Sequence, residues 1–179
     1  TVGAFALYPN PALIVPFLVA YLYAKGIGGF RLKGSKGMKN CIVAFTWSLG
    51  ILIFLGAISL PIMLVCLFFF CKSFVNTVIY DVRDVDKDRS AGILTIPTLF
   101  SRSQVTALLL GLSLAAHVVV FGAYFAGLIA GIDVLFISLI HSSFYIVAYC
   151  NHFEMLRNAL VDGEWILYAG YTILRDFVL

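Results

Sequence analysis

The sequence predicts an all-α fold, a polytopic transmembrane helix bundle with about six helices that form a single domain over residues 1–179. Of the 179 residues, 62% are hydrophobic and only 12% are charged, and the mean hydropathy is +1.03. Soluble domains have about 25% charged residues. The apolar residues also form long runs, separated by short polar segments. Helices of about 20 apolar residues cross a bilayer, so these runs indicate membrane spans.

Six apolar runs are the candidate spans, and they cover residues 8–24, 41–59, 61–80, 105–130, 132–150 and 165–179. The first contains prolines, which membrane helices tolerate when neighbouring groups satisfy the freed backbone. Almost no connection separates the second from the third. The fourth is long enough to cross with a tilt, and the sixth is short.

The placement of Lys and Arg predicts which connections lie in the cytoplasm, because cytoplasmic loops carry an excess of these residues. Three polar loops contain five, four and one of the chain's twelve Lys and Arg residues. An even number of spans separates these loops, so they share one face of the membrane. The connections on the opposite face contain no Lys or Arg. We therefore expect an integral membrane protein with three cytoplasmic loops, residues 25–40, 81–103 and 151–164.

The polar segment at residues 76–97 holds four of the nine acidic residues, Asp81, Asp84, Asp86 and Asp88. On a continuous helix, Asp81, Asp84 and Asp88 fall within an arc of about 60°, and Asp86 points the opposite way. Converging carboxylates repel each other unless a cation lies between them. Proteins commonly hold Mg²⁺ with one or two carboxylates and substrate phosphates. The pattern favours a Mg²⁺ site, and the alternative is a solvated charge run neutralised by neighbouring basic residues.

A stripe of polar residues leads through the third span to this acidic segment. Lys72, Asn76, Tyr80, Asp84 and Asp88 recur every four residues. Lys72 lies about 16 Å into a hydrocarbon core that is about 30 Å thick, and ionisable residues at such depth usually face a polar cavity. The stripe therefore predicts one wall of a cavity that opens toward the cytoplasm. The alternative is that Lys72 extends its side chain to the membrane surface.

The loop at residues 25–40 is basic and rich in glycine. Its cationic residues are Lys25, Arg31, Lys33, Lys36 and Lys39. Such a loop can bind a phosphorylated ligand, although its glycine and lysine order is not that of a P-loop. By itself it is more typical of a loop that touches anionic lipid headgroups. Beside a carboxylate cluster it favours a diphosphate, which requires both metal ions and direct cations.

The histidines and cysteines give weaker indications. His117 and His141 lie within predicted spans, where we expect them to form hydrogen bonds between helices. The cysteines are scattered through apolar segments without metal-ligand spacing, and we expect them to be packing residues. The sequence contains no motif for nucleic-acid binding.

Two segments resemble motifs of the UbiA superfamily of intramembrane prenyltransferases. Residues 83–97, RDVDKDRSAGILTIP, resemble the second aspartate-rich motif of that family, with Ile96 in place of its leucine. Residues 23–33, YAKGIGGFRLK, followed by Asn40 and Ala44, are similar to a basic loop between two earlier family helices. The order of spans and motifs matches along the whole chain. The resemblance implies a nine-helix fold around a central cavity that opens to lipid.

The resemblance also implies the roles of individual residues. Asp84 and Asp88 are expected to be the catalytic, metal-bridging pair, and Asp81 is expected to assist in binding Mg²⁺. The implied substrate-binding residues are Tyr23, Arg31, Lys33, Lys72, Asn76, Lys87 and Arg89. The implied reaction is Mg²⁺-dependent transfer of a prenyl group from an isoprenoid diphosphate to a lipid or quinone-precursor acceptor. The acceptor is geranylgeranylglyceryl phosphate or a hydroxylated aromatic acid, and the combination of Asp81 with Pro97 favours the former.

The chain departs from the family pattern in one respect. The first aspartate-rich motif, Asn-Asp-x-x-Asp-x-x-x-Asp, does not occur in these residues. Because Thr1 opens within an apolar run, we expect the chain to lack the first helices of a longer protein and to be inactive alone. Two alternatives from other classes are a membrane transporter for an anionic solute and a non-catalytic membrane subunit. A transporter would be supported by inverted repeats, and the acidic motif has no second copy.

Overall fold

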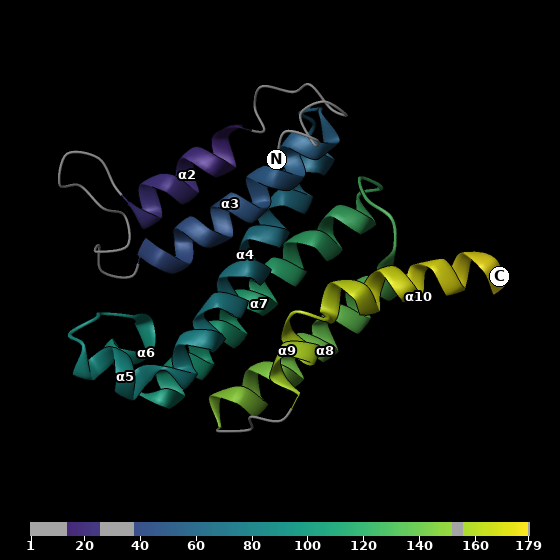
Figure 1. Cartoon of the computed structure of the whole chain (residues 1–179). Helices are drawn as coiled ribbons and strands as arrows, with labels where there is room; N and C mark the ends of the chain where they lie inside the picture. Colours follow the sequence, from purple (N-terminus) through teal and green to yellow (C-terminus); the bar gives the residue numbers. More distant parts are fainter. Residues whose placement is uncertain (1–13, 26–37, 152–155, 179) are drawn as a thin grey trace.

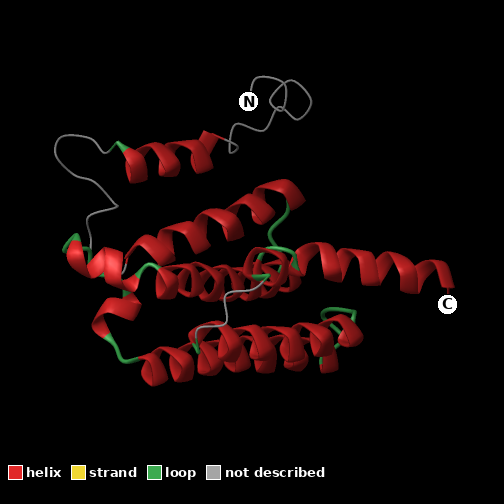
Figure 2. Cartoon of the chain, turned by 60° about the horizontal axis from the view of Figure 1, so that its bottom comes forward, coloured by secondary structure: helices red, strands yellow, loops and turns green. Residues whose placement is uncertain are grey.

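The computed structural model describes residues 14–25, 38–151 and 156–178, and every regular element within them is a helix (Figure 2). These helices are α2 (Ile14–Ala24), α3 (Met38–Leu55), α4 (Leu60–Arg83), α5 (Val85–Ser90), α6 (Ile96–Leu99), α7 (Arg102–Phe125), α8 (Ile132–Cys150), α9 (Arg157–Val161) and α10 (Glu164–Val178). Within the described residues, α3, α4, α7 and α8 are long and apolar enough to cross a membrane. The predicted fold class, a helical membrane bundle, is confirmed.

The four spanning helices match the second to fifth predicted spans. The third span is longer than predicted at its carboxyl end, since α4 continues to Arg83, and the fourth ends earlier, at Phe125. The sixth predicted span corresponds to α10, which has 15 residues, fewer than a straight crossing needs. The described part of the first span is α2, with 11 residues. Residues 8–13 of that span lie outside the described part of the chain.

The long helices pack side by side in the order of the chain. Helix α3 packs against α4, α4 against α7, and α7 against α8, while α10 packs on α8 (Figure 1). Helix α4 also contacts α8, so it lies at the centre of the bundle. One core cluster joins α4, α7 and α8 through Val78, Leu109 and Ile146, none of which is more than 1% exposed. Large side chains on the outer faces, such as Phe54 and Phe125, are exposed, as expected for helices surrounded by lipid.

The helix ends follow local signals in the sequence. Helix α4 begins after Ser59, whose hydroxyl accepts a hydrogen bond from the backbone N–H of Ile62, with proline in the first turn. Helix α7 begins at a capping box in which Ser101 and Gln104 satisfy each other's backbone N–H groups. Helix α5 ends at Ser90, and two residues later Gly92 has a φ of +66°, the left-handed conformation that favours glycine.

The acidic segment does not form one continuous helix, so the predicted single arc of three aspartates is wrong. Helix α4 ends at Arg83, and Asp84 has φ −93° and ψ 11°, between α4 and α5. The backbone N–H of Asp84 donates to the carbonyl of Asp81, which tightens the last turn before the chain changes direction. Figure 1 shows α5 and α6 leading away from the end of α4. Short acidic side chains compete with the helical backbone for hydrogen bonds, which favours such an end.

Candidate functional site

Asp81 lies in the interior at the end of α4, where it contacts the beginning of α3. It is 2% exposed. Its Oδ1 accepts a hydrogen bond from Lys39 Nζ at 2.5 Å, and its Oδ2 accepts one from Asn40 Nδ2 at 2.9 Å. The end of the basic loop and the acidic segment therefore lie at the same end of the bundle, as the sequence predicts. That this end is cytoplasmic stays a prediction.

Asp84 and Asp88 lie one turn apart and are both half-buried. The backbone N–H of Asp88 donates to the carbonyl of Asp84 at 2.8 Å. A hydrogen bond from Arg83 Nε, at 3.1 Å, lowers the pKa of Asp84. Burial, reinforced by the charge of Asp81, raises the pKa of Asp88. The two carboxyls thus have different proton affinities, and the negative charge near Asp88 is the kind that a bound cation would relieve.

The carboxylates of this region fit a cation that is bound jointly by the protein and by a ligand. Within the described residues, no group of three or more His, Cys, Asp or Glu side chains could hold a metal ion. Both carboxylate oxygens of Asp81 already accept hydrogen bonds. The remaining pair, Asp84 and Asp88, can supply the one or two carboxylates with which Mg²⁺ is bound beside substrate phosphates. Asp86 is fully exposed on the opposite face and takes no part in this pair.

The structure describes only some of the basic residues that are predicted to bind the substrate. Lys87 is exposed on α5. Its positive charge contributes to the lowered pKa of Asp84 and partly opposes the rise in the pKa of Asp88. Arg89 lies on the same face as Asp86, with its Nη1 3.8 Å from Asp86 Oδ1. Arg31 and Lys33 lie outside the described residues, as does the side chain of Tyr23 in α2.

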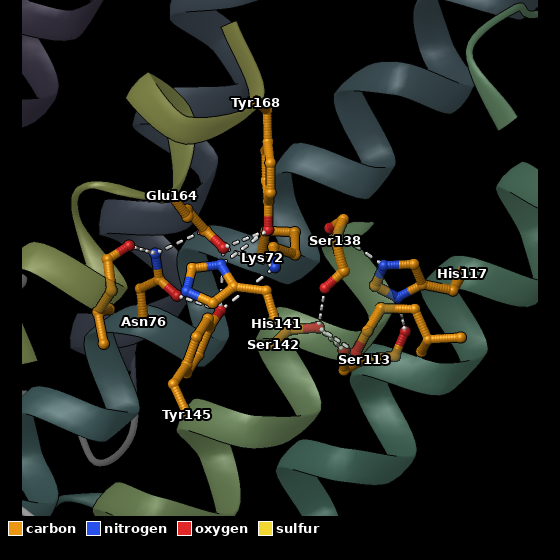
Figure 3. A network of polar contacts seen from close by, with 12 residues as sticks. Lys72, Asn76, Ser113, His117, Ser138, His141, Ser142, Tyr145, Glu164 and Tyr168 are labelled. Atoms are coloured by element: carbon orange, nitrogen blue, oxygen red, sulfur yellow. Dashed lines mark hydrogen bonds and ion pairs between the residues drawn. The ribbon is translucent and has the colours of Figure 1, made fainter. Parts of the chain in front are cut away.

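Lys72 does not reach the membrane surface, so the alternative of an extended lysine is wrong. It is 1% exposed, and its Nζ lies 2.8 Å from Glu164 Oε2 (Figure 3). Nζ also donates to the hydroxyl of Tyr145 at 3.3 Å, and it lies 5.9 Å from the ring centroid of Tyr168. The lysine is therefore held by a counter-charge and by two aromatic residues inside the bundle.

Glu164 is the functional candidate that the sequence analysis missed, because it stood at the edge of a predicted loop. It is 0% exposed at the first residue of α10. Its Oε1 accepts from Asn76 Nδ2 at 3.1 Å, and its Oε2 accepts from the hydroxyl of Tyr168 at 3.1 Å. The Tyr145 hydroxyl donates to Asn76 Oδ1 at 2.9 Å, which joins α4, α8 and α10 (Figure 3). A lysine at mid-depth in a membrane span requires a counter-charge, and a search for that counter-charge among the acidic residues could have identified Glu164.

The intramembrane histidines form the predicted hydrogen bonds between helices. His117 Nδ1 donates to the carbonyl of Ser113 at 2.7 Å, which leaves Nε2 to accept from the Ser138 hydroxyl on α8 at 3.2 Å. His141 Nδ1 lies 3.3 Å from the Tyr168 hydroxyl, which joins α8 to α10. Figure 3 shows His141 beside the Lys72–Glu164 pair and His117 farther away, next to Ser138 and Ser113.

A cavity of about 500 Å³ lies between α3, α4 and the start of α10. Asn76 and Tyr80 line it, as the polar stripe predicts, but Lys72 does not. The Tyr80 hydroxyl donates to Asp162 Oδ2 at 2.5 Å. The other walls are largely apolar and aromatic, and they include Trp47, Phe69 and Trp165.

The cavity and the acidic pair follow each other along the chain, although α4 ends between them. Tyr80, which lines the cavity, precedes Asp84 by four residues. Asp84 and Asp88 do not line the cavity themselves, so the apolar volume and the two carboxylates are neighbouring features that suit a ligand with an apolar tail and an anionic head. No protein-family model, curated protein or solved structure matches this chain.

Proposed function

We propose that this chain is part of an intramembrane prenyltransferase that transfers a prenyl group, with Mg²⁺, from an isoprenoid diphosphate to a lipid or aromatic acceptor. The observation that carries the proposal is the sequence of sites along α4. A largely apolar cavity of about 500 Å³ lies beside Asn76 and Tyr80, and the Asp84–Asp88 pair follows one turn later. An isoprenoid diphosphate has matching parts, an apolar chain joined to a polyanion.

The chemistry requires a bond between the allylic carbon and a diphosphate oxygen to break. The departing diphosphate keeps the electron pair, and an acceptor oxygen or ring carbon then bonds to the allylic carbon and releases a proton. Mg²⁺ bound together with the diphosphate supplies stabilisation of the negative charge that develops on the leaving oxygen. Asp84 and Asp88 would hold the diphosphate head through that ion.

The other residues of this region have supporting roles. The Lys87 ammonium adds positive charge near the two carboxylates. Phe69 and Trp165 stack with ring centroids 4.4 Å apart and form an apolar wall for the prenyl chain. Such a wall excludes water, which would otherwise react with the carbon that loses the diphosphate. Asp81 would act indirectly, because it fixes Lys39 and Asn40 beside the pair.

Ligand-dependent stabilisation tests the assignment without requiring turnover. Geranylgeranyl diphosphate should raise the thermal unfolding midpoint of the chain in lipid nanodiscs only when Mg²⁺ is present, because the ligand binds through the ion. The double variant Asp84→Asn with Asp88→Asn should lose this shift. Asp86→Asn is the matched control, since Asp86 lies in the same segment but is fully exposed and faces away from the pair. A shift that survives in the double variant, or that disappears equally in the control, contradicts the assignment.

A transporter for an anionic solute is the second candidate, and the buried Lys72–Glu164 pair is the observation that favours it. Ion pairs inside membrane bundles often mark solute or proton pathways. A transporter would move a solute such as phosphate into proteoliposomes, and Lys72→Met would stop that uptake. Geranylgeranyl diphosphate would then give no Mg²⁺-dependent stabilisation. A non-catalytic membrane subunit would show neither response.

A further inference from the structure

A second cavity, of about 410 Å³, lies against the opposite face of the α4–α5 segment. Arg83, Asp86 and Arg89 line it, whereas Asp84 and Asp88 do not. Asp81 on the acidic face contacts the beginning of α3, but the second cavity is closed by α7, α8 and α9. Arg89 therefore belongs to this cavity, although the family resemblance assigns it to diphosphate binding. Arg83 connects the two regions, because it lines this cavity and its Nε also donates to Asp84 Oδ1 at 3.1 Å.

The second cavity is strongly cationic. Among the described residues that line it, four are arginines, Arg83, Arg89, Arg102 and Arg157, and one is a carboxylate, Asp86. Arg83 also pairs with Asp84, which does not line the cavity, so the positive charge of the cavity rests mainly on the other three arginines. Asp86 is fully exposed, and it lies 3.8 Å from Arg89. Such an exposed and long ion pair neutralises little of the charge. Arginines whose guanidinium groups share one cavity favour an anion that can accept several hydrogen bonds.

Arg157, one of the residues that line the cavity, carries a buried and unsatisfied donor. Its side chain is 9% exposed, and its Nε has no hydrogen-bond partner among the described residues. Its guanidinium carbon lies 5.3 Å from the ring centroid of Tyr80, which fixes the group in place. A buried guanidinium donor without an acceptor costs free energy, and an anion in the cavity would supply that acceptor.

The start of α7 adds a further positive contribution. This helix has 24 residues and begins at Arg102, and its cap Ser101 also lines the cavity. The first backbone N–H groups of a helix have no partners within the helix, and the helix dipole places partial positive charge at this end. The backbone thus reinforces the side chains toward the same ligand type.

The position of the cavity identifies the kind of anion. The end of α4, the beginning of α7 and the end of α8 meet there, and all three helices are long enough to span the membrane. The ends of spanning helices lie at the level of the lipid headgroups. We propose that this cavity is a binding site for the phosphate group of an anionic phospholipid headgroup, separate from the Asp84–Asp88 site. The same chemistry would also accept a free phosphate.

Binding of phosphatidate tests the proposal. The purified chain in detergent micelles is titrated with phosphatidate, and phosphatidylcholine serves as the background lipid. We expect Arg102→Gln and Arg157→Gln each to weaken phosphatidate binding about tenfold, the effect of losing a charge-assisted hydrogen bond. Arg175→Gln removes the same charge beside Asp133 at the beginning of α8, whereas the cavity lies at the end of that helix, so its affinity should stay within about twofold of the unsubstituted chain.

Two further arms complete the experiment. Arg102 is exposed, so Arg102→Gln should fold normally even if Arg157→Gln does not. Arg157→Lys keeps the charge but removes the planar fork, and it should also weaken binding if the phosphate is held by the guanidinium. Inorganic phosphate at millimolar concentration should not displace phosphatidate if the lipid is the ligand, and displacement would identify free phosphate as the ligand instead. Equal losses in Arg175→Gln and Arg102→Gln, or unchanged binding in Arg102→Gln, would overturn the site.

Discussion

At the scale of single residues, the interior of the bundle is organised by Lys72 and its partner. A lone ammonium group at this depth would be costly, and Glu164 supplies the opposite charge at 2.8 Å. Asn76, Tyr145 and Tyr168 occupy the remaining hydrogen-bonding positions of the two charged groups. Such a satisfied pair specifies which faces of α4, α8 and α10 meet, because any other packing would leave charged groups unpaired.

Removing the negative member of this pair should be costly. We expect Glu164→Gln to lower the free energy of unfolding by about 3–5 kcal/mol, because Lys72 would stay buried without a counter-charge. Unfolding of the chain in mixed micelles by increasing SDS measures the change. The double variant Lys72→Met with Glu164→Leu removes both charges and should be closer in stability to the unsubstituted chain. Equal losses in the single and the double variant would contradict this account.

At the scale of secondary-structure elements, the break between α4 and α5 decides which side chains face which site. The end of α4 at Arg83 and the six-residue α5 place Asp86 and Arg89, but not Asp84 or Asp88, against the second cavity. Arg83 lies at the boundary, because it lines this cavity and its Nε also donates to Asp84. Helix α5 ends at Ser90, and the turn through Gly92 that follows is closed by a hydrogen bond from the backbone N–H of Ile93 to the carbonyl of Asp88 at 2.8 Å. The glycine therefore fixes the length of α5.

Two glycine substitutions should have opposite signs. Gly92 has φ +66°, so Gly92→Ala should destabilise the chain by about 1 kcal/mol, although the added Cβ meets no neighbour within 4 Å. Gly111 also has open space around it, but it lies inside α7, so Gly111→Ala should stabilise the chain by about 0.5–1 kcal/mol. SDS unfolding measures both changes. A stabilising Gly92→Ala would show that the backbone at this turn is not strained.

At the scale of the whole molecule, the helices pack in chain order, with α4 in the centre (Figure 1). Helix α4 has 24 residues, about 36 Å in length, so its two ends lie near opposite membrane surfaces. The acidic segment, the second cavity and the end of the basic loop lie near one of these ends. The positive charge of that end predicts that it is cytoplasmic.

Thiol labelling tests this orientation. Asp86 and Ile58 lie beyond opposite ends of α4, and their exposed fractions are high, 101% for the Asp86 side chain and 80% for Ile58. With the four native cysteines replaced by alanine, Asp86→Cys should react with a membrane-impermeant maleimide only after inverted vesicles expose the cytoplasmic side. Ile58→Cys should react from the other side. The reverse pattern would show that the arginine-rich end faces outward.

Most of the architecture could be predicted from the sequence because its signals are local. Long apolar runs must form helices in a membrane, so four spans were placed within a few residues of their observed ends. Of the predicted polar stripe, Asn76 and Tyr80 line a cavity, whereas Lys72, Asp84 and Asp88 do not. The sequence analysis missed the break at Asp84. Residue spacing alone suggested one continuous helix, but spacing does not show where short acidic side chains compete with the backbone for hydrogen bonds and end a helix.

By itself, the sequence determined that this protein is a helical membrane bundle with a polar stripe on its central helix, since composition and spacing act on each segment separately. Only the tertiary structure decided that Lys72 pairs with Glu164, and that the arginines gather in a cavity apart from the acidic pair. Both arrangements join residues that are distant in the chain. They depend on how α4 packs against α8, α9 and α10, and no local pattern records the rotation of one helix against another.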